Sequence, residues 1–306
     1  MALLRRALPF VGLLPAHLRP SPTPAIAKPI HAPDPHDKII GVEVLVNSLK
    51  LYYTDNAKSN VPVLIFIHGF PFDHTMWAAQ AAVADPFFRV ITYDHRGHGR
   101  SDAGDGQYAF EFFVDDLFGL MDALGIKQAI LCGLSMGGYT ALRATERDPE
   151  RVQGLILCDT QSAPDSNEAK LKRAASVRTI QQGGIATFTE GFLKAIFSPS
   201  SGSQKIKIVD QIRRVILANP LKGICGTLIA LATRTDTTPA LANIRVPTLI
   251  LVGDQDGITP PAAAQAMHER IPGSQMAVIP NAGHLSTVEN PEAFNTPFRE
   301  FIKTLK

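Results

Sequence analysis

From residue 39 to the C-terminus, short apolar runs alternate with segments that have a helical pattern. The runs are continuous and rich in aliphatic and β-branched residues, which is typical of strands buried on both faces. Strands of this kind that alternate with helices form a mostly parallel sheet with helices on both of its faces. The alternation therefore predicts an α/β fold for this part of the chain.

The runs predict eight strands. The first two, over residues 39–46 and 49–54, flank a short turn and should form an antiparallel hairpin at one edge of the sheet. The other six are expected over residues 63–69, 88–94, 129–135, 154–160, 248–256 and 276–284. Helices are expected over residues 74–84, 111–124, 136–147, 261–270 and 291–305.

The stretch from residue 160 to about residue 244 breaks this alternation, because it contains no strand-like run. Its patterns, such as AKLKRAASVRTIQ and FTEGFLKAIF, are helical. We interpret it as a helical cap, residues 160–243, inserted between core residues 38–159 and core residues 244–306. A separate small helical domain is the alternative, but the return to a strand at Thr248 favours an insertion.

The N-terminal segment, residues 1–37, is expected to be a tail outside the fold. Its first 33 residues contain no Asp or Glu, carry Arg5, Arg6 and Arg19, and are rich in proline. A targeting segment and a disordered tail both fit this composition, although Pro9 and Pro15 interrupt the apolar run that a secretory signal needs. We expect a cytoplasmic protein, or an organelle-targeted or exported one if this segment is a targeting signal.

The charge and the cysteines limit the partners. Lys and Arg number 30 against 28 Asp and Glu, so the net charge of +2 favours neither a nucleic acid nor an anionic membrane. No apolar run approaches the ~20 residues that span a bilayer. Cys132, Cys158 and Cys225 lack the spacing of a metal site or a disulfide framework, the first two read as buried core residues, and a reducing compartment is favoured. We therefore expect a small-molecule substrate and no metal or cofactor.

Residues with chemistry follow the predicted strands. In an open parallel sheet, ligands bind beyond the carboxyl ends of the strands. The side chains expected at this edge include a nucleophile, acids and a base: His68, Asp94, Ser135, Asp159, Asp254, Asp256 and His284.

The clearest motif is the G-x-S-x-G of residues 133–137, between a strand and a helix. A sharp turn there holds the Ser135 hydroxyl exposed as a nucleophile, and the Met136 N–H at the helix start can bind a developing oxyanion. The Phe70 N–H, in the loop after the third strand, is the expected second donor. The alternative for that loop is that His68 and Gly69 only shape a tight turn.

His284, between the last strand and the last helix, is the expected base, because imidazole accepts and returns a proton near neutral pH. Three aspartates are candidates for the acid that orients it. Asp256 lies further into its loop and can reach a base on the neighbouring strand, whereas Asp254 is expected to bond loop backbone. Asp159, one strand earlier, is the third candidate.

The order Ser135, Asp256, His284, together with HGFPFDHTMW, YDHRGHGRSD, GLSMGG, LVGDQDGITP and NAGH, resembles the α/β-hydrolase superfamily from residue 39 onward. More narrowly, it is similar to small bacterial-type carboxylesterases and 3-oxoadipate enol-lactonase-like members. The resemblance implies an α/β-hydrolase fold, the acid role for Asp256, and structural roles for residues 94–101 and 234–236. A serine at position 135 departs from the haloalkane dehalogenase and epoxide hydrolase branches, whose nucleophile is aspartate.

The expected reaction is hydrolysis of a carboxylic ester or lactone through an acyl-enzyme. Trp77 and Phe192, with Phe188 and Phe197, are candidates for an acyl pocket, with ordinary packing as the alternative. The same triad would serve an enol-lactonase with an anionic substrate, which would need Arg173 or Arg178 in the pocket. A carbon–carbon bond hydrolase, a cofactor-free perhydrolase and an inactive binding module also fit this sequence. The oligomeric state is left open.

Overall fold

The computed structural model describes residues 40–199, 201 and 205–305 of the chain. The expected N-terminal tail, residues 1–37, lies outside these residues.

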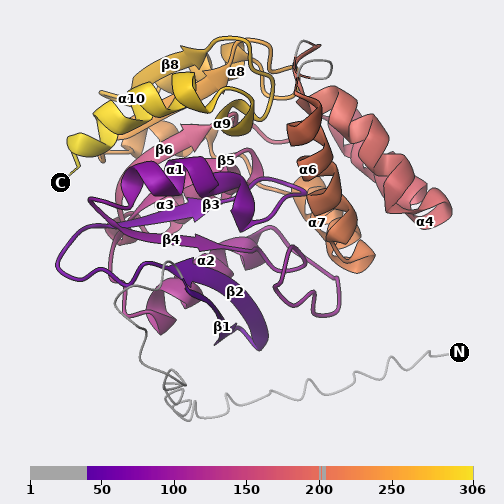
Figure 1. Ribbon diagram of the computed structural model, residues 1–306, viewed down its shortest axis with the longest axis horizontal. Coiled ribbons are helices and arrows are strands. Elements are labelled where there is room, and N and C mark those ends of the chain that lie inside the picture. The colour runs from indigo at the N-terminus through magenta and orange to yellow at the C-terminus, as the bar shows by residue number, and fades with distance from the viewer. Residues whose placement is uncertain (1–39, 200, 202–204, 306) are drawn as a thin grey trace, which may run out of the picture. The chain divides into compact units, whose positions relative to one another are not determined.

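All eight predicted strands are present and form one sheet, in the order β1-β2-β4-β3-β5-β6-β7-β8 (Figure 1). The pairing of β1 with β2 and of β2 with β4 is antiparallel, and all other neighbours are parallel. This confirms the predicted edge hairpin and the mostly parallel sheet. The strands are β1 Ile40–Val46, β2 Leu49–Asp55, β3 Val63–Ile67, β4 Arg89–Tyr93, β5 Ala129–Leu134, β6 Val152–Cys158, β7 Thr248–Gly253 and β8 Gln275–Ile279.

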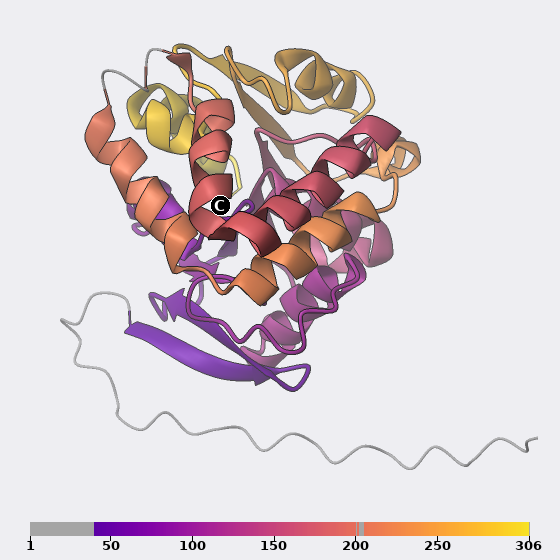
Figure 2. The same ribbon diagram turned by 90° about the vertical axis from the view of Figure 1, so that its right-hand side faces the viewer.

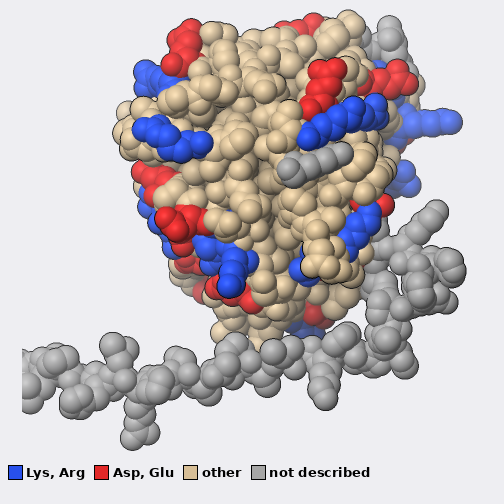
Figure 3. Space-filling model, turned by 90° about the vertical axis from the view of Figure 1, so that its left-hand side faces the viewer, with Lys and Arg blue, Asp and Glu red and all other residues tan. Residues whose placement is uncertain are grey.

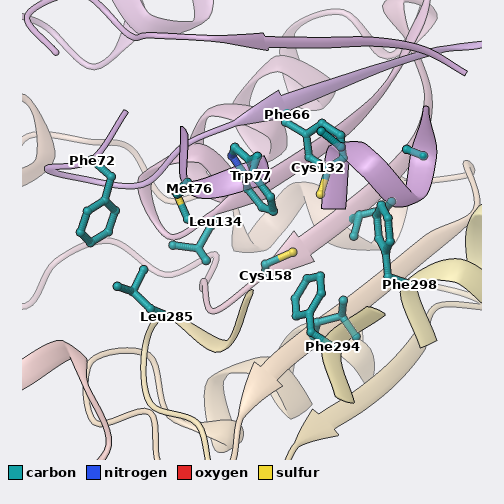
Figure 4. Close-up of a cluster of buried hydrophobic side chains, with 14 of the residues drawn as sticks. Phe66, Phe72, Met76, Trp77, Cys132, Leu134, Cys158, Leu285, Phe294 and Phe298 are labelled. Carbon is teal, nitrogen blue, oxygen red and sulfur yellow. The ribbon is translucent and has the colours of Figure 1, made fainter. Parts of the chain in front are cut away.

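Helices cover both faces of the sheet, and side chains alternate between the two layers along each strand. In β3, Phe66 joins the cluster beneath α1 Ala78–Ala84 and α10 Pro291–Lys303, whereas Ile65 joins the opposite cluster. The opposite face is covered by α2 Glu111–Ala123, α3 Met136–Arg147 and α8 Pro261–His268. Figure 4 shows the first cluster, with Cys132 and Cys158 inside it, so both cysteines are core residues as predicted.

Helices fill the chain between β6 and β7, and the described part of residues 160–244 contains no strand. They are α4 Asn167–Ile196, α6 Ile206–Ala218 and α7 Leu221–Ala232, followed by a 3-10 turn at Thr238–Asn243. Figures 1 and 2 show that α4, α6 and α7 lie together at one end of the sheet. We call these three helices the cap helices. A break at Gly184, with φ 76° and ψ 170°, divides α4 into two arms.

The surface carries charges of both signs. On the face shown in Figure 3, acidic and basic side chains are interspersed rather than gathered by sign. Within residues 40–199, 201 and 205–305, no single helix is long and apolar enough to cross a bilayer. Among these same residues, one bent pair, α6 with α7 at 96°, together has the length and composition of a span.

Candidate active site

Ser135 stands at the turn between β5 and α3. Its backbone has φ 53° and ψ −113°, a conformation that non-glycine residues rarely adopt and that is often kept at functional sites. The turn packs tightly on the neighbouring strand, since a Cβ on Gly137 would lie only 2.0 Å from the Ile67 carbonyl oxygen. The elbow therefore lies directly beside the loop that follows β3, in which Phe70 is found.

The three residues predicted as a triad come together in the structure. The His284 Nε2 lies 2.9 Å from the Ser135 Oγ, and the His284 Nδ1 lies 2.8 Å from the Asp256 Oδ2. Ser135 is 8% exposed and His284 2%. The Asp256 carboxylate is fixed from the far side, because its Oδ1 accepts the N–H of Ile258 at 2.8 Å and of Thr259 at 2.9 Å.

His284 and Asp256 shift each other's pKa in opposite directions. Burial lowers the pKa of His284, but the charge and hydrogen bond of Asp256 outweigh it, so the pKa is raised above the ordinary value. Burial raises the pKa of Asp256, but the charge of His284 and the hydrogen bonds from His284 and Thr259 lower it by more, so the pKa lies below its ordinary value. An imidazole held this way can take a proton from the Ser135 hydroxyl and carry the resulting positive charge.

The other two candidate acids are engaged elsewhere. The Asp254 Oδ1 accepts the backbone N–H of Ala282 at 3.2 Å. The Asp159 carboxylate accepts the N–H of Gly253 at 2.8 Å and the hydroxyl of Ser286 at 2.6 Å. Burial, together with the charge of Asp256, raises the pKa of Asp159 to about 8. The geometry thus brings Asp256, of the three, to the imidazole.

The two predicted oxyanion donors flank the nucleophile. Met136 is the first residue of α3, so its N–H has no partner within the helix. Within the described residues, the Phe70 N–H makes no hydrogen bond to another group. Phe70 and Met136 are both buried and share one apolar cluster. Two free N–H groups beside a serine hydroxyl are suited to bind an anionic oxygen.

The prediction that Trp77 lines a pocket is wrong. Trp77 is fully buried in the core under α1, with its ring 5.0 Å from that of Phe66 (Figure 4). Trp77 ends the 3-10 turn His74–Trp77 that precedes α1, and the apolar side chains of this turn pack into the core cluster. Phe197 also belongs to this core cluster. Phe192 lies at the site, because its ring is 6.0 Å from that of Phe70 and stacks on Phe188 at 5.3 Å.

Tyr139 is a site residue that the sequence reasoning missed. Its backbone N–H donates to the Ser135 carbonyl at 3.0 Å, and burial raises the pKa of the Tyr139 phenol. The guanidinium of Arg234 lies 4.0 Å from the centre of its ring. The available signal was spacing, since a residue four positions after Ser135 in the following helix lies above it on the same face. In the described residues, no group of three or more His, Cys, Asp or Glu side chains could hold a metal ion.

A cluster of buried imidazoles lies behind the oxyanion loop. The ring of His68 is 4.7 Å from that of His95 and 5.3 Å from that of His98, and all three residues are fully buried. The Nε2 atoms of His95 and His98 have no hydrogen-bond partner among the residues that the structure describes. Burial lowers the pKa of all three residues, well below the ordinary value for His95 and to about 3 for His98. The cluster is therefore neutral in the folded protein.

We expect the free energy of unfolding to fall as the pH drops below about 6.5, because burial lowers the pKa of the three imidazoles and the unfolded chain therefore takes up protons first. Each contributes a slope of about 1.4 kcal/mol per pH unit. Asp159 has the opposite effect on the free energy of unfolding below pH 8, because its raised pKa of about 8 keeps a proton on the folded state. The net uptake of protons on unfolding is thus smaller than the three imidazoles alone would give.

His95→Phe should reduce this acid slope by about one proton, since it removes one buried imidazole. Phenylalanine also suits the apolar surroundings, where Tyr93 and Phe113 already contact the ring. Urea unfolding at several pH values between about 5 and 7.5 measures the slope. An unchanged slope in the variant would show that His95 is not the proton acceptor we assign.

The chain resembles characterised hydrolases in sequence and in structure. A model of the alpha/beta hydrolase family matches residues 64–296. The 3-oxoadipate enol-lactonase 2 of Acinetobacter baylyi is 32% identical over 253 residues, which cover 83% of this chain and 93% of the relative.

Two solved structures share the fold and more than a quarter of the residues. A thermophilic esterase from Thermogutta terrifontis, bound to malate, has a TM-score of 0.81 and 37% identity, covering 87% of this chain and 99% of its own. The enol-lactonase from Burkholderia xenovorans has a TM-score of 0.80 and 30% identity, covering 86% of this chain and 100% of its own. The predicted fold class is confirmed, and the chain is an enzyme that belongs to the alpha/beta hydrolase family.

Proposed function

We propose that the protein hydrolyses carboxylic esters or lactones of small molecules through an acyl-enzyme on Ser135. The observation that carries this proposal is the continuous chain of contacts from the Ser135 Oγ through the His284 imidazole to the Asp256 carboxylate, at 2.9 and 2.8 Å. This chain provides a nucleophile, a base and an acid that holds the base in one orientation.

In the first half of the reaction, the His284 Nε2 takes the proton from the Ser135 hydroxyl as the Oγ bonds to the acyl carbon. The N–H groups of Phe70 and Met136 stabilise the oxyanion that forms. The imidazolium then gives its proton to the leaving alkoxide, and the ester C–O bond breaks. In the second half, water loses a proton to His284 and attacks the acyl-enzyme, which releases the acid and restores the Ser135 hydroxyl.

The surroundings of the nucleophile favour a neutral, apolar acyl group. Phe70, Met136, Tyr139 and Phe188 share one apolar cluster there. An anionic substrate would need a cationic partner, but Arg173 is paired with Asp165 and the side chain of Arg178 is exposed. The names of the relatives, esterase and enol-lactonase, support both ester and lactone as substrate classes.

We further propose that residues 160–243 act as a cap that shields the reaction from water. The low exposure of Ser135, 8%, and the contact of Phe188 and Phe192 from α4 with Phe70 support this role. For the cellular location we propose the cytoplasm, because Cys132, Cys158 and Cys225 are free thiols.

The test compares p-nitrophenyl esters of graded acyl length with simple lactones, after titration of active sites with a fluorophosphonate probe. We expect labelling at Ser135 and turnover of neutral substrates. p-Nitrophenyl butyrate should be cleaved at least about tenfold faster than the mono-p-nitrophenyl ester of succinic acid, because an unpaired carboxylate loses its hydration in an apolar site. A protein that neither labels nor turns over would be an inactive binding module, and a preference for the succinate ester would make the anionic lactone the better substrate class.

A further inference from the structure

The cap helices are hydrogen-bonded to the loop that carries His284. The backbone N–H of His284 donates to the carbonyl of Ile196, the last residue of α4, at 2.8 Å. The two segments are so close that a Cβ on Gly283 would lie 2.7 Å from the Ile196 oxygen and 2.7 Å from the Ser198 nitrogen. The end of α4 is therefore a direct neighbour of the base.

Glu289 holds these two segments together. It is 2% exposed, and its carboxylate bridges two backbone N–H groups, that of Gly283 at 2.8 Å from Oε1 and that of Ser198 at 2.9 Å from Oε2. The side chain of Lys205, just before α6, bonds the Glu289 carbonyl. A buried carboxylate is costly unless hydrogen bonds satisfy it, so this one fixes the distance between the His284 loop and the chain that leaves α4.

A second buried side chain joins the cap helices to the oxyanion loop. Asn219 lies between α6 and α7, and its Nδ2 donates to the carbonyl of Pro71 at 2.8 Å. Its Oδ1 accepts the N–H of Gly99 at 2.7 Å. Because Pro71 directly follows Phe70, this amide fixes the loop whose N–H faces the developing oxyanion.

We propose that the cap helices position both halves of the active site, with Glu289 as the positioning residue for His284 and Asn219 as the positioning residue for the Phe70 loop. This inference rests on the proposed function. Catalysis then depends on the position of the cap helices. A shift of α4 moves His284, and a shift of the turn between α6 and α7 moves the Phe70 N–H. Small displacements of this kind cost about 100-fold in rate when they misplace reacting groups by 1 Å.

Two nearly isosteric variants separate the two contacts. In Glu289→Gln, an NH₂ group replaces one of the two carboxylate oxygens. The backbone N–H that this oxygen accepts is then left without an acceptor. In Asn219→Asp, an oxygen replaces the donor to Pro71, while the acceptor for Gly99 remains. Each should lower kcat/KM about 10- to 100-fold per titrated site.

The two variants are distinguished by how the loss in kcat/KM depends on the leaving group of the ester. A misplaced His284 protonates the leaving alkoxide poorly, so Glu289→Gln should impair an ethyl ester more than the p-nitrophenyl ester of the same acid, whose leaving group needs no proton. A misplaced Phe70 weakens oxyanion binding for both, so Asn219→Asp should impair the two esters equally.

The matched control is Arg213→Gln. Arg213 joins α6 to α4 through Glu190, and both side chains are partly exposed. It should change kcat/KM by less than about twofold, with any effect confined to the melting temperature. If Glu289→Gln does not fold, Gly283→Ala tests the same contact, because its new methyl group pushes the His284 loop away from Ile196 and Ser198.

The inference is overturned if Glu289→Gln and Asn219→Asp melt at lower temperature yet keep the wild-type kcat/KM per titrated site for both esters. Equal losses for both esters in Glu289→Gln would also contradict the role assigned to it. A wild-type protein that neither labels nor turns over marks a different failure, that of the proposed function, and the inference falls with it.

Discussion

Ser135→Ala is expected to lower kcat for ester hydrolysis by about 10⁶-fold, because loss of the nucleophile alone removes nearly the whole effect of a triad. Turnover that remains would come from the oxyanion donors at Phe70 and Met136. The fold should survive, since the only hydrogen bond of the Ser135 hydroxyl among the described residues is the one to His284, which serves the reaction. Alanine is no more strained than serine at φ 53°.

The measurement is kcat with a p-nitrophenyl ester, together with the melting temperature and fluorophosphonate labelling. Ser176→Ala is the control, because among the described residues the Ser176 hydroxyl donates only to the Lys172 carbonyl, within α4. It should keep wild-type turnover and labelling. Turnover above about one thousandth of wild type in purified Ser135→Ala would require another nucleophile and would end the proposed mechanism.

Asp256→Asn is expected to lower kcat by about 10⁴-fold while leaving the loop intact. The amide oxygen would keep the position of Oδ1, which accepts the N–H groups of Ile258 and Thr259. The amide nitrogen would then face the His284 Nδ1 and donate to it. The imidazole proton would therefore sit on Nε2, toward Ser135, where a proton acceptor is needed.

The same variant should shift the pH dependence of kcat/KM. The reaction needs a neutral imidazole, so the rate falls as the pH drops through the pKa of His284. Although burial lowers that pKa, the charge of Asp256 raises it above its ordinary value in the wild type. Asp256→Asn removes the charge, so the residual activity should persist to lower pH than the wild-type activity.

Asp254→Asn is the matched control for this loop. Asp254 is exposed and bonds the Ala282 N–H, so its loss should cost a little stability and no more than a few-fold in rate. If Asp254→Asn were the inactive variant and Asp256→Asn nearly normal, our assignment of the acid would be wrong. If both variants kept their activity, Asp159 would become the leading candidate.

The sequence predicted most of this fold because its strands are continuous apolar runs and its helices begin and end at recognisable residues. β5 and α3, for example, lie within one or two residues of the predicted bounds. The order of Ser135, Asp256 and His284 is readable for the same reason, since Ser135 directly follows β5 and the other two lie in the loops after β7 and β8.

The misassigned and missed residues depend on contacts between distant segments. Trp77 was expected at the site, but its position is decided by packing against Phe66, which no local pattern encodes. Glu289 and Asn219 are polar residues in unremarkable surroundings whose partners lie 91 and 148 positions away. Sequence spacing alone gives no signal for such pairs.

The direct pairing of β6 with β7 gives the cap helices a modular character. Cys158 stands opposite Leu251 in the sheet, so the chain leaves and returns at adjacent strands. A chimera with junctions at residues 159 and 248 can thus exchange this segment between relatives without breaking a strand pair. Such a graft would work only if the donor segment supplied a carbonyl where Ile196 meets the base and an amide where Asn219 meets Pro71. A change of substrate range in this protein would then proceed through cap sequences that keep these two docking points and vary the apolar side chains between them.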